Sequence, residues 1–115
     1  MGEIVKHIKT LKELNKKETT QYKTQNIFVD FVNTEHEKGL ERAEIYQIWS
    51  YSTIIAYYNR ATNKVVFTSK KYTRTTGKQK NNIINENGLE KQEINKTFTN
   101  WGTYSDLQEI KAFLI

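Results

Sequence analysis

The feature that most restricts the fold of this chain is a pair of β-forming runs at its centre. Aromatic and β-branched side chains dominate residues 46–58 and 64–73, and the Asn-rich sequence NRATNK joins the two runs. Such side chains favour a pleated, half-buried surface, and a bridge of this length suits a four- or five-residue hairpin loop. The sequence therefore predicts an antiparallel hairpin in the middle of a small sheet.

The hydrophobic period on either side of this hairpin predicts further strands and helices. Residues 3–17 place apolar side chains at helical spacing with lysines opposite them, which predicts an N-terminal helix. In residues 25–33, Ile27, Val29 and Phe31 share one face, which predicts a strand that is buried on at least one face, and the alternation in residues 92–101 predicts a last strand. Between and after these strands, residues 75–88 and 104–115 predict a post-hairpin helix and a C-terminal helix.

Both of the later helices carry candidate end signals. Thr75 or Thr76 can cap the start of the post-hairpin helix, and Gly88 can end it. In the C-terminal helix, Ser105 and Gln108 have the spacing of a capping box. The buried stripe expected for that helix consists of Leu107, Ile110 and Leu114.

The predicted fold class is α+β in a single domain, residues 1–115. The chain has no proline and no linker-like run, so nothing marks a domain boundary. We expect a small, mainly antiparallel sheet of about four strands, with the N-terminal, post-hairpin and C-terminal helices packed on one face. A chain of this length buries about two-thirds of its unfolded surface, and such a thin core is compatible with a homodimer.

Several kinds of chemistry have no support in the sequence. The absence of cysteine excludes disulfides, thiolate zinc sites and cysteine nucleophiles. His7 and His36 have no second ligand at a fixed spacing, so no metal is predicted. Glu109 and Lys111 resemble the acid-x-Lys pair of metal-dependent nucleases, but in a helix they point to different faces. No Gly-rich phosphate loop or nucleophile elbow occurs, and we predict a non-enzymatic protein without a cofactor.

The N-terminal residues mix charged and apolar side chains and have no continuous apolar core. We therefore expect no signal peptide and no membrane span, and a location in the cytoplasm of a host cell. The abundance of Lys, Asn and Ile, which have AT-rich codons, indicates an AT-rich genome, such as that of a low-GC Gram-positive bacterium or its phage.

Three side chains have two interpretations each. Asp30 lies in a strongly apolar strand, where it needs a partner such as a central lysine if it is buried and none if it is exposed. Trp49 and Trp101 are expected to fill the core, since tryptophan in or beside a strand usually does. Exposure of either would instead mark an interaction hot spot.

The charge is unevenly distributed along the chain. Residues 45–85 contain no acid but seven cations, whereas the remainder holds 11 cations and 13 acids. We expect this block to form one cationic, tyrosine-containing face that binds an anionic partner. The alternative interpretation is that these are ordinary solvated lysines on strand edges, where they discourage aggregation.

The end of the hairpin and the start of the following helix form the candidate binding cassette. A helix start offers unpaired N–H donors and the positive end of the helix dipole, which together attract phosphate. Tyrosines of the cassette can provide faces on which single-stranded bases stack, although they can equally be half-buried strand residues. These stacking candidates are Tyr51, Tyr57, Tyr58 and Tyr72. The candidate nucleic-acid or partner-binding residues are Arg60, Lys64, Lys70, Lys71, Tyr72, Arg74, Thr75, Thr76, Lys78 and Lys80.

The same segment carries a pattern of Ser-Tyr, an Ile-Ala pair, a hairpin, and then Tyr-x-x-Thr-Thr-x-Lys-x-x-Asn. The matching positions here are Ser50, Tyr51, Ile55, Ala56, Tyr72, Thr75, Thr76, Lys78 and Asn81. The pattern resembles a module of small proteins from phages and other mobile elements of low-GC bacteria, whose usual Ser after the Thr-Thr pair is Gly77 here. The resemblance covers about a third of the chain and implies an origin, without a mechanism.

Three functional hypotheses follow from these observations. The first is a phage or mobile-element protein that binds a host nucleic acid or nucleoprotein, such as a CRISPR effector, through the basic cassette. The second is an anti-CRISPR protein or other inhibitor of host defence that acts through protein–protein contacts alone. A small nuclease is the third, and it would need a cluster of carboxylates or histidines that this sequence scatters.

Overall fold

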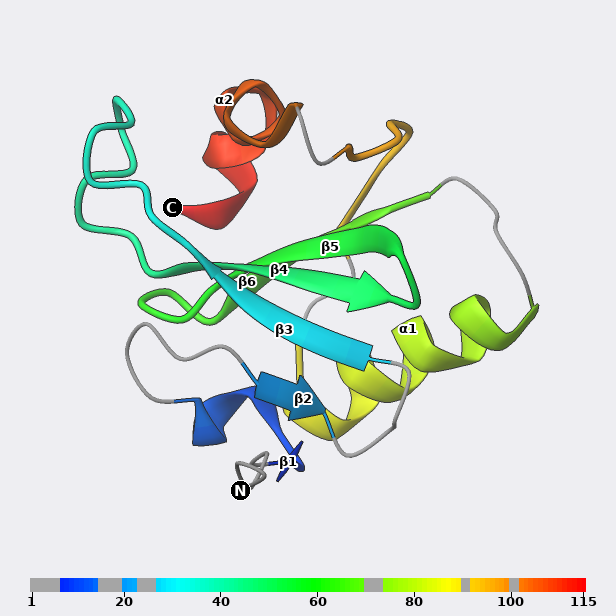
Figure 1. The fold of residues 1–115 in the computed structure, drawn as a ribbon. Helices are drawn as coiled ribbons and strands as arrows, with labels where there is room; N and C mark the ends of the chain where they lie inside the picture. The colour runs from blue at the N-terminus through cyan, green and yellow to red at the C-terminus, as the bar shows by residue number, and fades with distance from the viewer. Residues whose placement is uncertain (1–6, 15–19, 23–26, 70–73, 90–91, 100–101) are drawn as a thin grey trace, which may run out of the picture.

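The computed structural model describes residues 7–14, 20–22, 27–69, 74–89, 92–99 and 102–115. Within these residues seven strands form one sheet in which the strand order follows the chain order (Figure 1). The strands are β1 (His7–Ile8), β2 (Thr20–Tyr22), β3 (Ile27–Val32), β4 (Ile45–Ser50), β5 (Thr53–Asn59), β6 (Lys64–Thr68) and β7 (Glu93–Ile94). The helices are the short 3₁₀ helix η1 (Leu11–Glu13), α1 (Arg74–Asn87) and α2 (Thr103–Leu114).

The fold class predicted from the sequence is confirmed as α+β with a mainly antiparallel sheet. Strands β2 to β6 pair antiparallel with their neighbours. The two-residue strands β1 and β7 pair parallel with β2 and β6 at the edges. The expected number of about four strands was too low, because β1 and β2 were not predicted and the run 46–58 forms two strands, β4 and β5.

The central β-rich segment contains three strands where the sequence predicts two. The β5–β6 hairpin is confirmed, but the run 46–58 divides into β4 and β5 around Tyr51 and Ser52. Tyr51 has φ +56°, in the left-handed region that aromatic residues rarely adopt. The turn carries no Gly, Asn or Pro, and Ser52 is a weaker turn signal that does not separate the two strands on its own.

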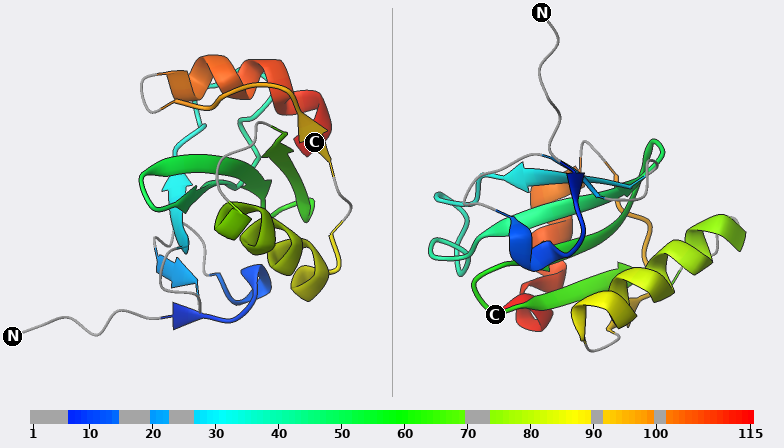
Figure 2. Two further views of the ribbon diagram at one scale, coloured as in Figure 1. Left: turned by 90° about the vertical axis from the view of Figure 1, so that its right-hand side faces the viewer. Right: turned by 90° about the horizontal axis from the view of Figure 1, so that it is seen from below.

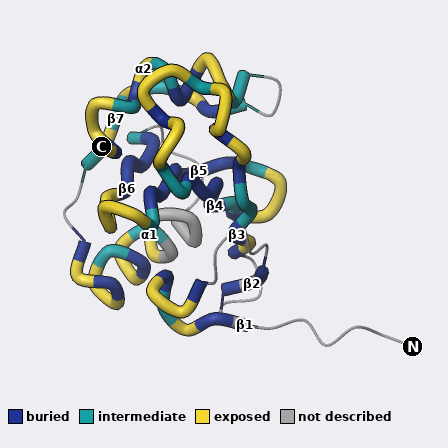
Figure 3. The backbone as a smooth tube through the Cα atoms, turned by 90° about the vertical axis from the view of Figure 1, so that its left-hand side faces the viewer, coloured by how far each residue is buried: buried dark blue, intermediate teal, exposed yellow. Residues whose placement is uncertain are grey.

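The two long helices lie on opposite faces of the sheet, and the expectation that all helices share one face is wrong (Figure 2). Tyr58 and Val65 pack in the core on the α1 side, whereas Tyr57 and Val66 pack in the core on the α2 side. Successive strand residues point to opposite faces, so runs that are apolar at every position need cover on both sides. Figure 3 shows the result, with β4 to β6 largely buried between layers whose outer surfaces are exposed.

The expected N-terminal helix is also wrong within the described residues. His7 and Ile8 form β1, and only Leu11–Glu13 make a helical turn. The Glu13 carboxylate accepts hydrogen bonds from the backbone N–H groups of Lys9 at 2.6 Å and Thr10 at 2.8 Å. These bonds hold the chain extended before the turn, while the buried Ile8 and Leu11 face the core. The remainder of the predicted range lies outside the described residues.

Helix α1 ends where the sequence predicts, because Gly88 after it has φ +60°. The helix begins at Arg74, so Thr75 and Thr76 lie in its first turn and are not its N-cap. In α2 the predicted stripe is confirmed, since Leu107, Ile110 and Leu114 are buried.

The capping box predicted for the C-terminal helix and the length predicted for the last strand are wrong. Helix α2 begins at Thr103 after Gly102, which leaves no capping box at Ser105 and Gln108. The strand predicted at 92–101 is reduced to β7.

No helix in the described part of the chain is long and apolar enough to cross a membrane.

Candidate nucleic-acid interface

The path of the chain separates the predicted binding residues into two groups. The β5–β6 loop lies at one end of the hairpin, and α1 starts beyond the other end (Figure 1). Helix α1 then runs back along β6, so that Gly88 and Leu89 line a surface pocket together with Asn63 and Lys64. Arg60 and Lys64 therefore lie far from the start of α1, at its C-terminal end.

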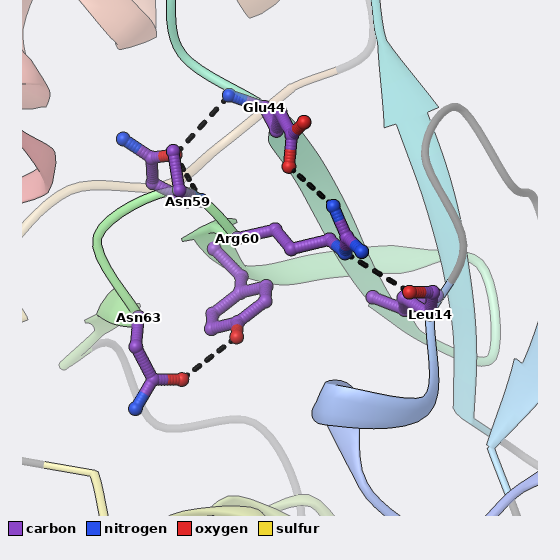
Figure 4. Close-up of polar contacts among 7 residues, drawn as sticks. Leu14, Glu44, Asn59, Arg60 and Asn63 are labelled. Carbon is purple, nitrogen blue, oxygen red and sulfur yellow. Dashed lines mark hydrogen bonds and ion pairs between the residues drawn. The ribbon is translucent and has the colours of Figure 1, made fainter.

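Arg60 is held by contacts inside the protein (Figure 4). Its Nη1 lies 2.7 Å from Glu44 Oε2, and its Nε donates to the carbonyl oxygen of Leu14 at 2.9 Å. The hydrogen bond from Arg60 to Glu44 raises the pKa of the guanidinium. The side chain thus joins the start of β4, the end of β5 and the segment after η1, and its charge is compensated.

The rest of the β5–β6 loop is tied down by a polar network. The buried Asn59 accepts hydrogen bonds from the backbone N–H groups of Glu44 and Ala61, and its Nδ2 donates to the carbonyl of Leu114. Lys64 Nζ donates to the carbonyl oxygen of Ile115 at 2.8 Å. These contacts connect the loop to the end of α2 and give this part of the basic block a structural role.

Lys80 also has a structural role, at the other face. Its Nζ lies 2.8 Å from Glu93 Oε1, donates to the carbonyl of Thr68 at 3.1 Å, and sits 5.9 Å from the centroid of the Phe67 ring. Only 15% of this side chain is exposed, and it attaches α1 to β6 and β7. The expectation that the seven cations form one uncompensated face is therefore wrong, because distant glutamates pair with Arg60 and Lys80.

The outward face of α1 has a different composition. Lys78, Asn81, Asn82 and Asn85 are all exposed. They occupy positions i, i+3, i+4 and i+7, which form one stripe along a helix. We call these four residues the α1 stripe. It presents one ammonium group and three carboxamides to solvent. The helical period places these four residues on the face opposite the buried Ile83, so the stripe could be located from the sequence.

The fourth asparagine of α1 points inward and accounts for how the helix packs. Asn87 Oδ1 accepts from the backbone N–H of Leu11 at 2.7 Å, while its Nδ2 donates to Ile83 O at 2.8 Å and Tyr22 Oη at 3.2 Å. Ile83 is buried in the same core, and Ile84 packs against it. Helix α1 is therefore attached through one face, and the α1 stripe lies on the other.

The sequence of this chain was compared with those of known protein families. A sequence profile for a family of unknown function, DUF8033, matches residues 9–100. The chain belongs to the DUF8033 family. Searches of curated proteins and of solved structures find no match. The range matched to DUF8033 includes β2 to β7, α1 and the α1 stripe, and it ends before α2.

Several predicted site residues of this DUF8033 protein have no described side chain. Lys70, Lys71 and Tyr72 lie outside the described residues. The backbone of Arg74, Thr75 and Thr76 forms the first turn of α1, but their side chains are not described. Of the candidates in the cassette after the hairpin, Lys78 is the one whose exposed side chain the structure describes.

The stacking role expected for two tyrosines is wrong. Tyr57 and Tyr58 are buried in opposite cores of the DUF8033 fold, and burial raises the pKa of both hydroxyl groups. Tyr51 is 62% exposed at the β4–β5 turn, on a different element from α1. Tyr57 and Tyr58 therefore cannot be part of a stacking platform next to the α1 stripe.

The other residues considered in the sequence analysis are an acid, two tryptophans and a histidine. Asp30 is half-buried and lies opposite Gln47 in the β3–β4 register, so it is not the deeply buried acid that would require a lysine. Trp49 packs against the α2-side core as expected, and its buried Nε1 has no hydrogen-bond acceptor among the described residues. Trp101 lies outside them. His36 is exposed, and no group of three metal-binding side chains occurs in the described ranges.

Proposed function

We propose that this protein is a non-enzymatic nucleic-acid-binding protein of a phage or mobile element that acts in the cytoplasm of its host. The observation that supports the proposal is the composition of the α1 stripe, in which a lysine and three asparagines are exposed together. Lysine neutralises phosphate, and asparagine both donates to phosphate and contacts base edges. The protein would bind a host nucleic acid or nucleoprotein, of which a CRISPR effector is one example.

The charge distribution around α1 favours the same partner. Lys70, Lys71 and Arg74 precede Lys78 in the sequence, and the first turn of α1 carries no acid. A helix N-terminus adds a partial positive charge to these cations. By contrast, Arg60 and Lys80 are paired with glutamates, so they are not part of the proposed binding surface.

Binding of fluorescently labelled DNA and RNA at increasing salt concentration tests the proposal. With about four phosphate contacts, the affinity should fall about 100-fold between 50 and 200 mM salt, because each contact releases counterions. Lys78→Ala should reduce the slope of log K against log salt by about one. Lys64→Ala is the matched control, since it removes the same charge at the opposite end of the hairpin and should leave the slope unchanged.

Two results would contradict this proposal. One is binding that does not depend on salt, or the absence of binding to DNA and RNA. The other is an equal effect of Lys64→Ala and Lys78→Ala, because the interaction would then depend on net charge and not on α1. Incubation with Mg²⁺ or Mn²⁺ should give no cleavage of either nucleic acid.

A second candidate function is inhibition of a host-defence complex through protein contacts alone. The observation that favours it is a pair of aromatic residues on the α2 side of the sheet, where Phe28 is 37% exposed and lies opposite the half-buried Trp49. Exposed aromatic residues are common binding anchors. This function predicts that a protein partner co-purifies and that nucleic acid does not. The ratio of absorbance at about 260 and 280 nm detects nucleic acid in the preparation and therefore separates this function from nucleic-acid binding.

A further inference from the structure

We infer that α1 is a recognition helix for the major groove of duplex DNA and that Asn81, Asn82 and Asn85 contact the edges of adenine bases. The inference rests on the proposed function and deepens it, because it names the form of the nucleic acid and the residues that select its sequence. It depends on three properties of α1, which are its accessibility, its dimensions and the chemistry of its outward face.

The side of helix α1 that carries the α1 stripe is exposed at each of its four residues, from Lys78 to Asn85. It packs against the sheet through Ile83, Ile84 and Asn87, which lie opposite the α1 stripe. Figure 2 places α1 on the outside of the sheet, and its right-hand view shows the N-terminal end of the helix extending past the strands. A partner can therefore approach the stripe without displacing any described element of the fold.

The dimensions of the stripe match a short segment of duplex. Seven residues separate Lys78 from Asn85, which corresponds to about 10.5 Å along the axis at about 1.5 Å per residue. That distance is about three base-pair steps of about 3.4 Å. A helix with its side chains is about 10–12 Å across, and the major groove of B-DNA is about 12 Å wide.

The chemistry of the stripe favours base contacts. A carboxamide can donate to N7 of adenine through one atom and accept from N6 through the other. Asparagine also costs up to about 0.7 kcal/mol of helix stability relative to alanine, so three exposed asparagines are not explained by the stability of α1. Asn87 is explained by its buried hydrogen bonds, whereas the three outward asparagines make no such contacts within the described residues.

The same features favour duplex DNA over other partners. The major groove of duplex RNA is too narrow for side chains on a helix to reach the bases. The residues that dominate protein–protein binding are most often Trp, Tyr and Arg, and the α1 stripe holds none of them. The exposed ammonium group of Lys78, with Arg74 one helical turn before it in the sequence, is complementary to the charge of the DNA backbone.

Binding of the full chain to an alternating A·T duplex tests the inference. Three matched probes of equal length accompany it: a G·C duplex, an A·T duplex with 7-deazaadenine in place of adenine, and an A–U RNA duplex. The expected result is that each of the three binds at least about tenfold more weakly, because one bidentate contact contributes a factor of about 5 to 160 and the stripe can make three such contacts. Deazaadenine removes only N7, so it separates major-groove contacts from effects of DNA shape.

The variant with Asn81→Ala, Asn82→Ala and Asn85→Ala should bind all four probes with equal affinity. Because alanine is the better helix former, circular dichroism should show that the variant is folded. Equal binding of the four probes by the unchanged protein, or a preference retained by the variant, would overturn the inference. The proposed function would still stand in that case if the binding depended on salt. The absence of binding to every probe would overturn both.

Discussion

Removing the charge of Lys80 should lower the stability of the protein, whereas removing the charge of Lys78 should leave the stability almost unchanged. Lys80 contacts Glu93 and the carbonyl of Thr68 from a position that is 15% exposed, whereas Lys78 is exposed on the other side of the helix. Lys80→Met keeps the aliphatic stem over Phe67 and removes the ammonium group. A hydrogen bond to a charged group contributes about 1.5–3 kcal/mol, and partial exposure favours the lower half of that range.

We therefore expect Lys80→Met to lower the free energy of unfolding by about 2 kcal/mol. With a urea m-value of about 1.5 kcal/mol/M, the midpoint of urea unfolding followed by circular dichroism falls by about 1.3 M. Lys78→Met is the matched control, and it should change the free energy by less than about 0.5 kcal/mol. In a double-mutant cycle, adding Glu93→Gln to Lys80→Met should cost much less than Glu93→Gln alone.

Equal destabilisation by Lys80→Met and Lys78→Met would refute this reasoning, because it would show that the effect of Lys80 does not come from its contacts with Glu93 and Thr68. The same conclusion would follow if Glu93→Gln and Lys80→Met had additive effects. In either case, Lys80 could not be separated from the proposed binding surface on structural grounds.

Two further predictions concern the core. Asn87→Ala should lower the free energy of unfolding by about 3 kcal/mol in urea titrations, because the buried N–H of Leu11 and the hydroxyl of Tyr22 each lose a partner. Burial raises the pKa of Tyr22, Tyr57 and Tyr58 above the usual value of 10.0, so the unfolded chain releases these protons first. The stability from these tyrosines is therefore fully present below about pH 10 and falls as the pH rises above it; unfolding that is independent of alkaline pH would contradict this linkage.

The parts of the fold that could be predicted from the sequence are those fixed by local patterns. The β5–β6 hairpin follows from two β-rich runs around an Asn-rich loop, and the buried stripe of α2 follows from the spacing of Leu107 and Leu114. Gly88 marks the end of α1 because a left-handed residue commonly ends a helix. Each of these features depends on residues that are close together in the chain.

The features that could not be predicted depend on contacts between distant segments. Glu44 pairs with Arg60 across 16 positions and Glu93 with Lys80 across 13, so the absence of acids from the central block did not indicate uncompensated charge. The carboxylate of Glu13 caps the start of the helical turn at Leu11, so the described residues before it are extended, although the apolar spacing of the segment is helical.

The candidate site was predicted only in part. Lys78 was expected and is exposed, and Asn81 was part of the recognised pattern. Asn82 and Asn85 were not predicted, because they are uncharged and a search for a basic surface does not identify amides. The helical period that locates the α1 stripe was nevertheless present in the sequence, and it could have identified all four residues.

The most direct test of the central claim is a heteronuclear NMR titration of the labelled protein with an alternating A·T DNA duplex. Chemical-shift changes should be largest for the backbone and side-chain amides of Asn81, Asn82 and Asn85, and the indole N–H of Trp49 on the opposite face should be unaffected. Changes centred on Phe28 and Trp49, or a spectrum that the duplex leaves unchanged, would contradict the claim that α1 binds nucleic acid.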